Sequence, residues 1–262
     1  MNWQPTGRIP PDSLTSARLQ LHYGAYVLGS TAHSVLPPVE DDSHTNLGFE
    51  PAFRSLATRD LPTSHRLHLD IETFTLVLRD GDRSVASRPL AGETVDGALA
   101  WIAVTLSRPV ARREYPDFPA SPLATDGAFA KPPAAELAEL AAWFGNAQAL
   151  FDSVSAPSRV WPHHFDLGAL LPLSDDGAVS IGLGLSPGDG FFDQPYFYCS
   201  PYPAPDDASA LPPLAVGHWT TDGFTSAIAT ATELAAAGAP GDAAARYLED
   251  ALHRCRELLQ QP

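Results

Sequence analysis

The sequence predicts an α+β protein in which antiparallel strands are faced by helices on one side. Five segments carry apolar residues at helical spacing, and shorter apolar or alternating runs lie between them. Two of these runs end at Asp-Gly pairs, which are typical of hairpin turns. Strands that follow one another through short turns pair antiparallel, so the sheet or sheets should be antiparallel.

The first half of the chain supplies two of the helices. Pro11 and Asp12 favour a helix start, and apolar residues then recur every three or four positions until Pro37 ends the pattern. Alternation from His65 to Leu78, with one change of phase at Thr73, predicts a long strand with a bulge. A turn at Asp80-Gly81, a return strand over 84–88 and a helix over 95–106 follow.

The second half begins after a segment rich in proline and alanine, 115–133, which indicates an ordered connector or a linker. Next comes the clearest helix, starting after Pro133, whose apolar residues step by three and four. Strands are expected near 160–173, 179–185 and 196–200. Two helices should close the chain, capped by Asp222 and Asp242.

These boundaries divide the chain into an N-terminal α+β half (1–115), a connector (116–133) and a C-terminal half (134–262) that carries the candidate site. Each half follows a helix, strand, strand, helix order. The spacing of 68-HLDI-71 to Asp80-Gly81 also repeats in 164-HFDL-167 to Asp176-Gly177. Two related halves would explain this repeat, and so would chance, because Asp-Gly is a common turn.

Charge excludes two classes of partner. The formal net charge is −15, from 31 acidic and 16 basic residues, and such a surface repels nucleic acid and anionic membranes. The first residues have no apolar signal-peptide core, and no stretch is long and apolar enough to span a bilayer, which favours a soluble, cytoplasmic protein. Cys199 and Cys255 lack disulfide-framework or metal spacing and are expected to be buried thiols.

Two catalytic motifs fail on mechanism. The sequence 184-GLSPG-188 matches the serine-esterase elbow, but Pro187 follows the serine and has no N–H for an oxyanion, and no helix is expected after it. A dinucleotide loop after Gly182 and Gly184 would need a third glycine where Pro187 stands. The sequence therefore predicts neither serine hydrolysis nor dinucleotide binding, and the residues identify no cofactor.

A histidine and aspartate pair is the sharpest chemical hypothesis. On a strand, His164 and Asp166 would point to one face, about 7 Å apart at Cα. With His218 downstream they match the two-histidine, one-carboxylate ligand set of non-haem iron enzymes. The arginine that oxoglutarate-dependent members carry further along is absent, with Ile228 at its position. The alternative is that Asp166 orients a core histidine.

Aromatic residues crowd the same stretch of the chain. Aromatic walls with a few polar groups are typical of small-molecule pockets, and equally of protein cores. If the stretch forms a pocket, the ligand-binding residues are expected to be Trp161, His163, His164, Asp166, Asp189, Tyr196 and Tyr198. Asp189, in the turn 186-SPGD-189, is also expected to hold backbone N–H groups.

At these residues the chain resembles an uncharacterised bacterial family, the domain of unknown function number 5996. The resemblance rests on 161-WPHHFD-166, 186-SPGD-189, 195-PYFY-198 and Tyr202-Pro203. It extends more loosely through the first helix, 47-LGF-49 and the 67–81 strand, so that it covers most of the chain. It implies membership alone, because no activity, cofactor or catalytic residue comes with the family.

Three functions remain open from sequence. The first is a small-molecule-binding protein with an aromatic, His/Asp-lined pocket. The second is a metal-dependent enzyme that uses His164, Asp166 and His218. The third is a structural or interaction protein with no site. The sequence does not determine the oligomeric state.

Overall fold

The computed structural model describes residues 3–205 and 211–260 of the chain. They form two compact units, each an antiparallel sheet with helices, which confirms the predicted α+β class. The first unit comprises residues 13–141 and 159–166, and the second the remaining described residues. No helix in the described ranges has the length and apolarity needed to cross a membrane.

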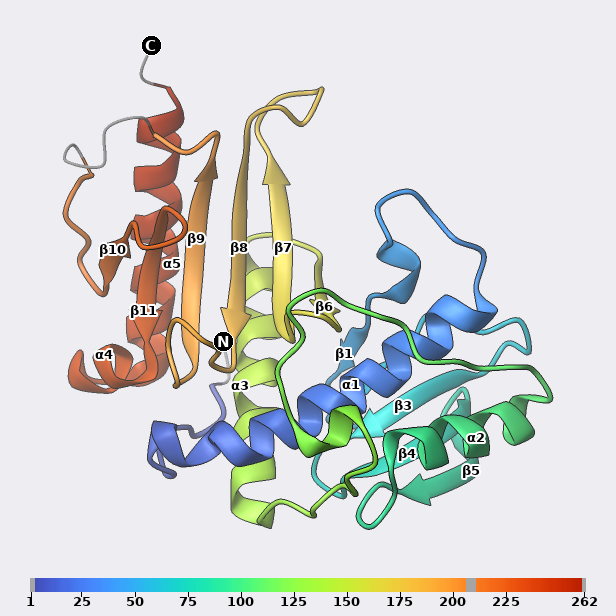
Figure 1. Cartoon of the computed structure of the whole chain (residues 1–262). Coiled ribbons are helices and arrows are strands. Elements are labelled where there is room, and N and C mark those ends of the chain that lie inside the picture. Colours follow the sequence, from blue (N-terminus) through green and yellow to red (C-terminus); the bar gives the residue numbers. More distant parts are fainter. Residues whose placement is uncertain (1–2, 206–210, 261–262) are drawn as a thin grey trace. The chain divides into compact units, whose positions relative to one another are not determined.

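The first unit is built on a five-stranded sheet with strand order β1-β2-β3-β4-β5. Every neighbouring pair is antiparallel. The strands are β1 (Gly48–Glu50), β2 (Ser55–Ala57), β3 (Arg66–Asp70), β4 (Thr75–Asp80) and β5 (Arg83–Pro89). Two helices, α1 (Thr15–Val35) and α2 (Val95–Leu106), lie on the same face of this sheet (Figure 1).

Leucines on alternate strand positions form the contact with α1. Leu67 pairs with Leu78 and Leu69 with Leu76, so all four point to one face, and all are buried. The period-two pattern seen in the sequence therefore places an apolar layer under the helices. Thr94 caps α2 by accepting a hydrogen bond from the Gly97 N–H.

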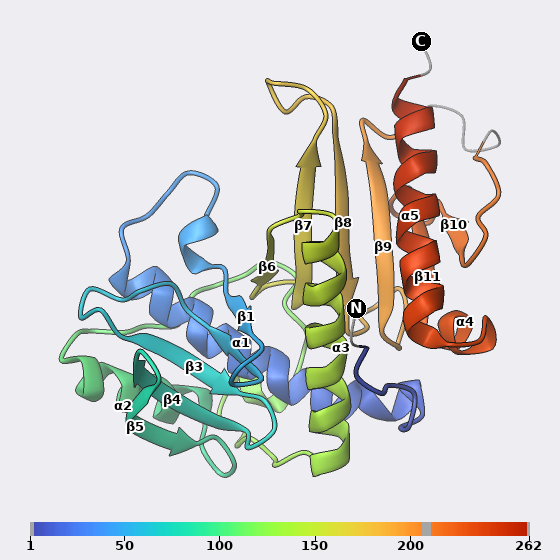
Figure 2. The ribbon, with the colours of Figure 1, turned by 180° about the vertical axis from the view of Figure 1, so that it is seen from behind.

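The second unit is built on a sheet whose strands follow the order β10-β11-β9-β8-β7. These strands are β7 (Asp166–Pro172), β8 (Ser180–Ser186), β9 (Tyr196–Tyr202), β10 (His218–Thr220) and β11 (Ser226–Thr230), whereas β6 (Ser158–Trp161) belongs to the first unit from residue 159 on. The helices are α3 (Ala134–Ser153), which belongs to this unit from residue 142 on, α4 (Ala231–Ala236) and α5 (Pro240–Leu259). Figure 2 shows the C-terminal part of α3 and the whole of α5 on one face of the sheet.

Aromatic rings fill the space between this sheet and its helices. The ring of Phe197 on β9 packs against Trp143 and Phe151 of α3, at centroid distances of 6.2 and 6.1 Å. Tyr247 of α5 is buried, and its hydroxyl donates a 2.7 Å hydrogen bond to the carbonyl oxygen of Ala227. The predicted apolar stripe of α5 thus faces the sheet.

Two predicted long strands are each two strands joined by a tight turn. The 65–78 strand is interrupted at 71–74, and the 160–173 strand at 162–165. The last residue of each turn, Phe74 or Phe165, has a positive φ (55° and 60°) and a buried ring. A left-handed phenylalanine is uncommon, which is why alternation alone did not reveal these turns.

The helix predicted to begin at Asp222 is also wrong. Residues 226–230 form β11, and the helix begins only after Thr230. Thr230 and Glu233 make a capping box, in which each side chain bonds the backbone N–H of the other residue. This cap fixes the helix start eight residues later than the predicted one.

Candidate functional site

The first unit contains a hollow of about 770 Å³ between α1 and the segment that follows α2. We call residues 111–130 the strap; they have no regular structure except one short turn of 3₁₀ helix at Pro122–Ala124. The lining consists of Tyr23, Tyr26, Arg112, Arg113, Glu114, Tyr115, Pro116, Phe118, Pro119, Ala120 and Ala124. The segment predicted to be a connector, 116–133, therefore supplies five of these eleven lining residues.

Phe118 of the strap lies at the centre of an aromatic cluster. Its ring centroid is 4.5 Å from that of His22, 5.0 Å from Tyr23 and 5.1 Å from Tyr26. Tyr115 stacks beside it at 6.0 Å. Tyr26 follows His22 by four positions and Tyr23 by three, so its ring lies beside both on the helix surface. Tyr23 and Tyr26 line the hollow and give it an aromatic floor.

Tyr115 connects this hollow to three of the predicted site residues. Its ring stacks on His163 at 5.5 Å, His163 lies 4.1 Å from His164, and Trp161 lies 5.9 Å from His163. Gly29 of α1 permits the approach, because a Cβ there would come within 2.8 Å of Pro162. The structure thus brings Trp161, His163 and His164 together behind one wall of the hollow.

His22 holds the turn that carries these residues. Its Nε2 lies 3.0 Å from the carbonyl oxygen of Pro162, and its ring stacks on Phe165 at 5.0 Å. Burial lowers the pKa of His22 to about 3 and that of His163 to about 4. Both imidazoles are therefore neutral at pH 7. A neutral His22 donates from Nε2 to the carbonyl oxygen, so it acts as a structural residue.

Arg113 forms an ion pair with Asp42 and a cation–π contact with the ring of Tyr115. Its Nη2 donates to Asp42 at 2.7 Å, and its guanidinium lies 4.9 Å above the Tyr115 ring. The hydrogen bond from Arg113 lowers the pKa of Asp42, and the same bond raises the pKa of Arg113. Nη1 also lies 3.2 Å from Nδ1 of His33. Arg113 thereby fixes one wall of the hollow through Tyr115.

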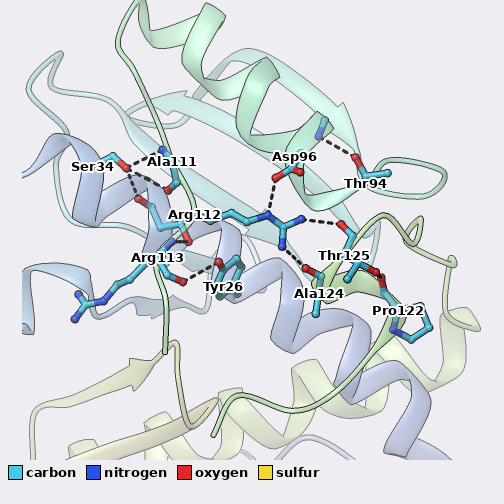
Figure 3. Close-up of polar contacts among 12 residues, drawn as sticks. Tyr26, Ser34, Thr94, Asp96, Ala111, Arg112, Arg113, Pro122, Ala124 and Thr125 are labelled. Carbon is cyan, nitrogen blue, oxygen red and sulfur yellow. Dashed lines mark hydrogen bonds and ion pairs between the residues drawn. The ribbon is translucent and has the colours of Figure 1, made fainter. Parts of the chain in front are cut away.

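Arg112 fastens the strap to itself and to α2 (Figure 3). Its Nε donates to Asp96 at 2.6 Å, while Nη1 and Nη2 donate to the carbonyl oxygens of Ala124 and Thr125 at 2.7 and 3.0 Å. The planar guanidinium presents its N–H donors in a fixed fork, so it suits three separate acceptors better than an ammonium group does. The opposite wall of the hollow is therefore held by one side chain.

A stripe of polar side chains on α1 binds the strap backbone from below. Tyr26 donates to the carbonyl oxygen of Arg113 at 2.8 Å, and Tyr23 donates to that of Pro119 at 2.6 Å. The remaining contacts are Gln20 with the Ala130 N–H, Ser30 with the Arg113 N–H and Ser34 with the Ala111 N–H. The strap is thus ordered along its length by one helix face.

The predicted geometry of His164 and Asp166 is wrong. They do not share a strand face, because 162–165 is a turn in which the Phe165 N–H donates to the Trp161 carbonyl oxygen at 2.7 Å. His164 lies in the turn and is exposed, while Asp166 is the first residue of β7. The period-two argument holds only within a continuous strand.

The other predicted ligand-binding residues lie in the second unit. The carboxylate of Asp189 accepts hydrogen bonds from the N–H groups of Phe191 and Phe192 at 2.8 and 3.1 Å, as expected for a turn residue. It also accepts from the Ser186 and Tyr196 hydroxyls at 3.2 and 2.5 Å. This carboxylate therefore stabilises the turn after β8.

Tyr198 lies on the same sheet face as Tyr196, at a centroid distance of 6.4 Å. Its ring crosses the backbone of Gly184, where a Cβ would collide with the ring carbons and the hydroxyl. The predicted site residues thus separate into two groups, one around His163 and one around Asp189, each within its own unit.

His218, the third proposed metal ligand, has a different partner. It is exposed in β10, and its Nδ1 lies 2.8 Å from Oε1 of Glu233, the capping residue of α4. Across residues 3–205 and 211–260, no three His, Cys, Asp or Glu side chains gather in a way that could hold a metal ion.

Sequence reasoning missed the α1 and strap residues that line the hollow. The helix was recognised from its apolar positions, and its polar stripe carries no motif. One signal was present in the sequence. Two tyrosines and a histidine lie within five residues of α1, and Tyr115 and Phe118 are large aromatic residues in a segment that was predicted to be a connector.

A comparison of the chain with known protein families, curated proteins and solved structures found no match.

Proposed function

We propose that the protein binds a small molecule in the hollow between α1 and the strap. The observation that carries this proposal is a concave, aromatic-walled space of about 770 Å³ within one unit. Pockets for small molecules have volumes of about 300–1,000 Å³ and combine apolar walls with a few polar groups. His163 and His164, which were predicted to bind the ligand, would then support the Tyr115 side of the pocket from behind.

The lining favours a flat ligand with a polar or anionic end. The partly exposed rings of Tyr115 and Phe118 offer faces and edges on which a planar group can stack, above the buried rings of Tyr23 and Tyr26. Arg112 and Arg113 are the positive charges of the lining, against Glu114. Each arginine already pairs with an aspartate, so stacking, more than charge, should supply the affinity.

Dye binding provides a direct test. Anilinonaphthalene sulfonate is a flat aromatic anion whose fluorescence rises in apolar surroundings. We expect saturable binding of the dye to the native protein, and its release by some members of a panel of planar aromatic carboxylates. Ligand-observed NMR with the same panel measures binding without the dye.

Substitutions locate the binding. Phe118→Leu removes the central ring of the cluster and should weaken binding about tenfold, equivalent to about 1.4 kcal/mol of lost stacking. Tyr202→Leu, which changes an exposed tyrosine of the second unit, is the matched control and should bind as the wild type does. Equal binding by the Phe118 variant, or no saturable binding to the native protein, would refute the proposal.

Family and location form part of the same proposal. The resemblance of 161-WPHHFD-166 to domain of unknown function 5996 supports relating this pocket to that bacterial family, since His163 stacks on its wall. A cytoplasmic location, which was predicted from the lack of a signal-peptide core and of a membrane-spanning stretch, would expose the pocket to the metabolites of the cell interior.

A further inference from the structure

The two cysteines of the chain meet in the core of the second unit. Cys199 lies on β9 and Cys255 on the last turns of α5, 56 positions apart. Their sulfur atoms are 3.6 Å apart, and both residues are fully buried. Sequence spacing gave no reason to pair them, because no C-x-x-C pattern is present.

Within the described residues, the polar contacts of the two thiols are the one between the sulfur atoms and one with a backbone carbonyl oxygen. The Cys255 thiol lies 3.7 Å from the carbonyl oxygen of Cys199, and a thiol is a weak donor. Around them, the sheet neighbours of Cys199 are Leu183 and Ala227. Both residues fill space in the core, and the proximity of their two sulfurs permits a chemical role as well.

We infer that Cys199 and Cys255 form an intramolecular disulfide when the protein meets a small oxidant such as hydrogen peroxide. A disulfide bond is about 2.05 Å long, so the sulfurs need to approach by about 1.5 Å through rotation of the Cys199 and Cys255 side chains. The bond would attach α5 covalently to the middle of the sheet.

The chemistry balances with peroxide as the oxidant. One thiolate attacks the O–O bond, becomes a sulfenic acid and releases one hydroxide, which takes up the thiol proton to give water. The second thiol then attacks the sulfenic sulfur and releases the second water. Two thiols and one peroxide therefore give one disulfide and two waters, and the two sulfurs lose one electron each.

Burial makes this reaction slow. The hydrogen bond with Cys255, together with burial, raises the pKa of the Cys199 thiol, so little reactive thiolate is present at pH 7. Oxidation should therefore proceed over hours and require transient opening of α5. This pair is a latent cross-link that forms under sustained oxidation.

Mass spectrometry of the reduced, native protein after exposure to peroxide tests the inference. The expected product has lost two hydrogen atoms, has no alkylatable thiol in denaturant, gives a peptide pair joined through Cys199 and Cys255, and returns to the starting mass with dithiothreitol. It should also unfold at a higher temperature, because the cross-link restricts the unfolded chain.

Cys255→Ala is the matched control, and it should gain oxygen atoms or remain unchanged. The peptide map of the wild-type protein stands alone if this variant does not fold. Addition of oxygen atoms to the wild type without loss of hydrogen, two thiols that stay alkylatable, or covalent dimers as the main product would each overturn the inference. It is independent of the proposed ligand pocket, because it concerns the other unit.

Discussion

Tyr198 and Gly184 show how a single side chain can dictate the residue beside it. The tyrosine ring lies across the glycine backbone on the neighbouring strand, so only a residue without a Cβ fits there. We expect Gly184→Ala to displace the ring and to destabilise the protein by about 1–3 kcal/mol. Urea unfolding measures this loss.

Gly182 provides the matched control on the same strand and face. An added Cβ there meets no heavy atom within 4 Å. Gly182→Ala should leave the stability unchanged or raise it by about 0.5–1 kcal/mol, because alanine loses less backbone entropy on folding. Equal losses in the two variants would show that glycine is required by the strand and not by the ring.

Two buried histidines and one half-buried histidine should make the protein sensitive to mild acid. Burial lowers the pKa of His22 and His68 to about 3 and that of His163 to about 4, from an ordinary value of 6.5. Their contribution to stability is complete above pH 6.5 and is lost as the pH falls towards these folded-state values. Each histidine adds a slope of about 1.4 kcal/mol per pH unit within this window.

Urea titrations at several pH values measure this slope. His68→Gln should reduce this slope by the contribution of one group, because it removes one titrating imidazole. A free energy of unfolding that stays constant between about pH 7 and pH 5 would contradict the assignment of neutral buried imidazoles.

At the residue scale, local patterns were predictable and distant ones were not. Asp189 was expected to bind backbone N–H groups, and it does, because its partners lie two and three residues away. The packing of Tyr115 against His163 joins positions that are 48 residues apart in sequence. No spacing rule in a single sequence relates such positions.

Among the elements, two helix starts were predicted well, whereas the predicted caps Asp222 and Asp242 do not cap a helix. The 95–106 helix has its predicted bounds, and α3 begins directly after Pro133. Strands were harder, because turns with a non-glycine residue at positive φ leave no sequence signal; Arg54, Phe74 and Phe165 each end such a turn. In the sequence, the turn that ends at Phe74 was indicated by the change of phase at Thr73.

Arg112 should contribute to the order of the strap in addition to the α1 stripe. Arg112→Met removes the donors to the carbonyl oxygens of Ala124 and Thr125. We expect a loss of about 1–2 kcal/mol and faster amide hydrogen exchange over 111–130, with little change elsewhere. The ion pair with the exposed Asp96 should contribute little to this loss.

Hydrogen exchange followed by mass spectrometry resolves this effect by segment. Arg112→Lys keeps the charge but loses the planar fork, so it should behave like the methionine variant. Arg108→Met, at an exposed position just after α2, is the control and should exchange as the wild type does. Unchanged protection of the strap in both Arg112 variants would show that the α1 stripe alone holds it.

At the scale of the molecule, neither unit is a continuous stretch of chain. The first unit needs 159–166 in addition to 13–141, and the second needs 142–158 and the N-terminal residues. The α+β class followed from local patterns, whereas this interleaving depends on contacts between segments far apart in sequence. Each unit therefore contains residues from both of the predicted halves, 1–115 and 134–262.

Separated fragments should not fold. Expressed alone, 1–133 lacks the turn at 162–165 against which His22 packs, and 134–262 lacks the N-terminal residues, including Gln4, which bonds Asn146. We expect both to be unfolded by circular dichroism and proteolysis, and co-expression to restore structure in part. A fragment that unfolds cooperatively on its own would contradict this expectation.

The polar stripe of α1 has a consequence for how this sequence can change over time. Its contacts to the strap run from Gln20 to Ser34, and each depends on the rotational position of the helix. Inserting or deleting one residue within this range would turn the remainder of α1 by about 100° and remove the later contacts together. Single substitutions on the helix surface should be tolerated, whereas insertions and deletions between Gln20 and Ser34 should not.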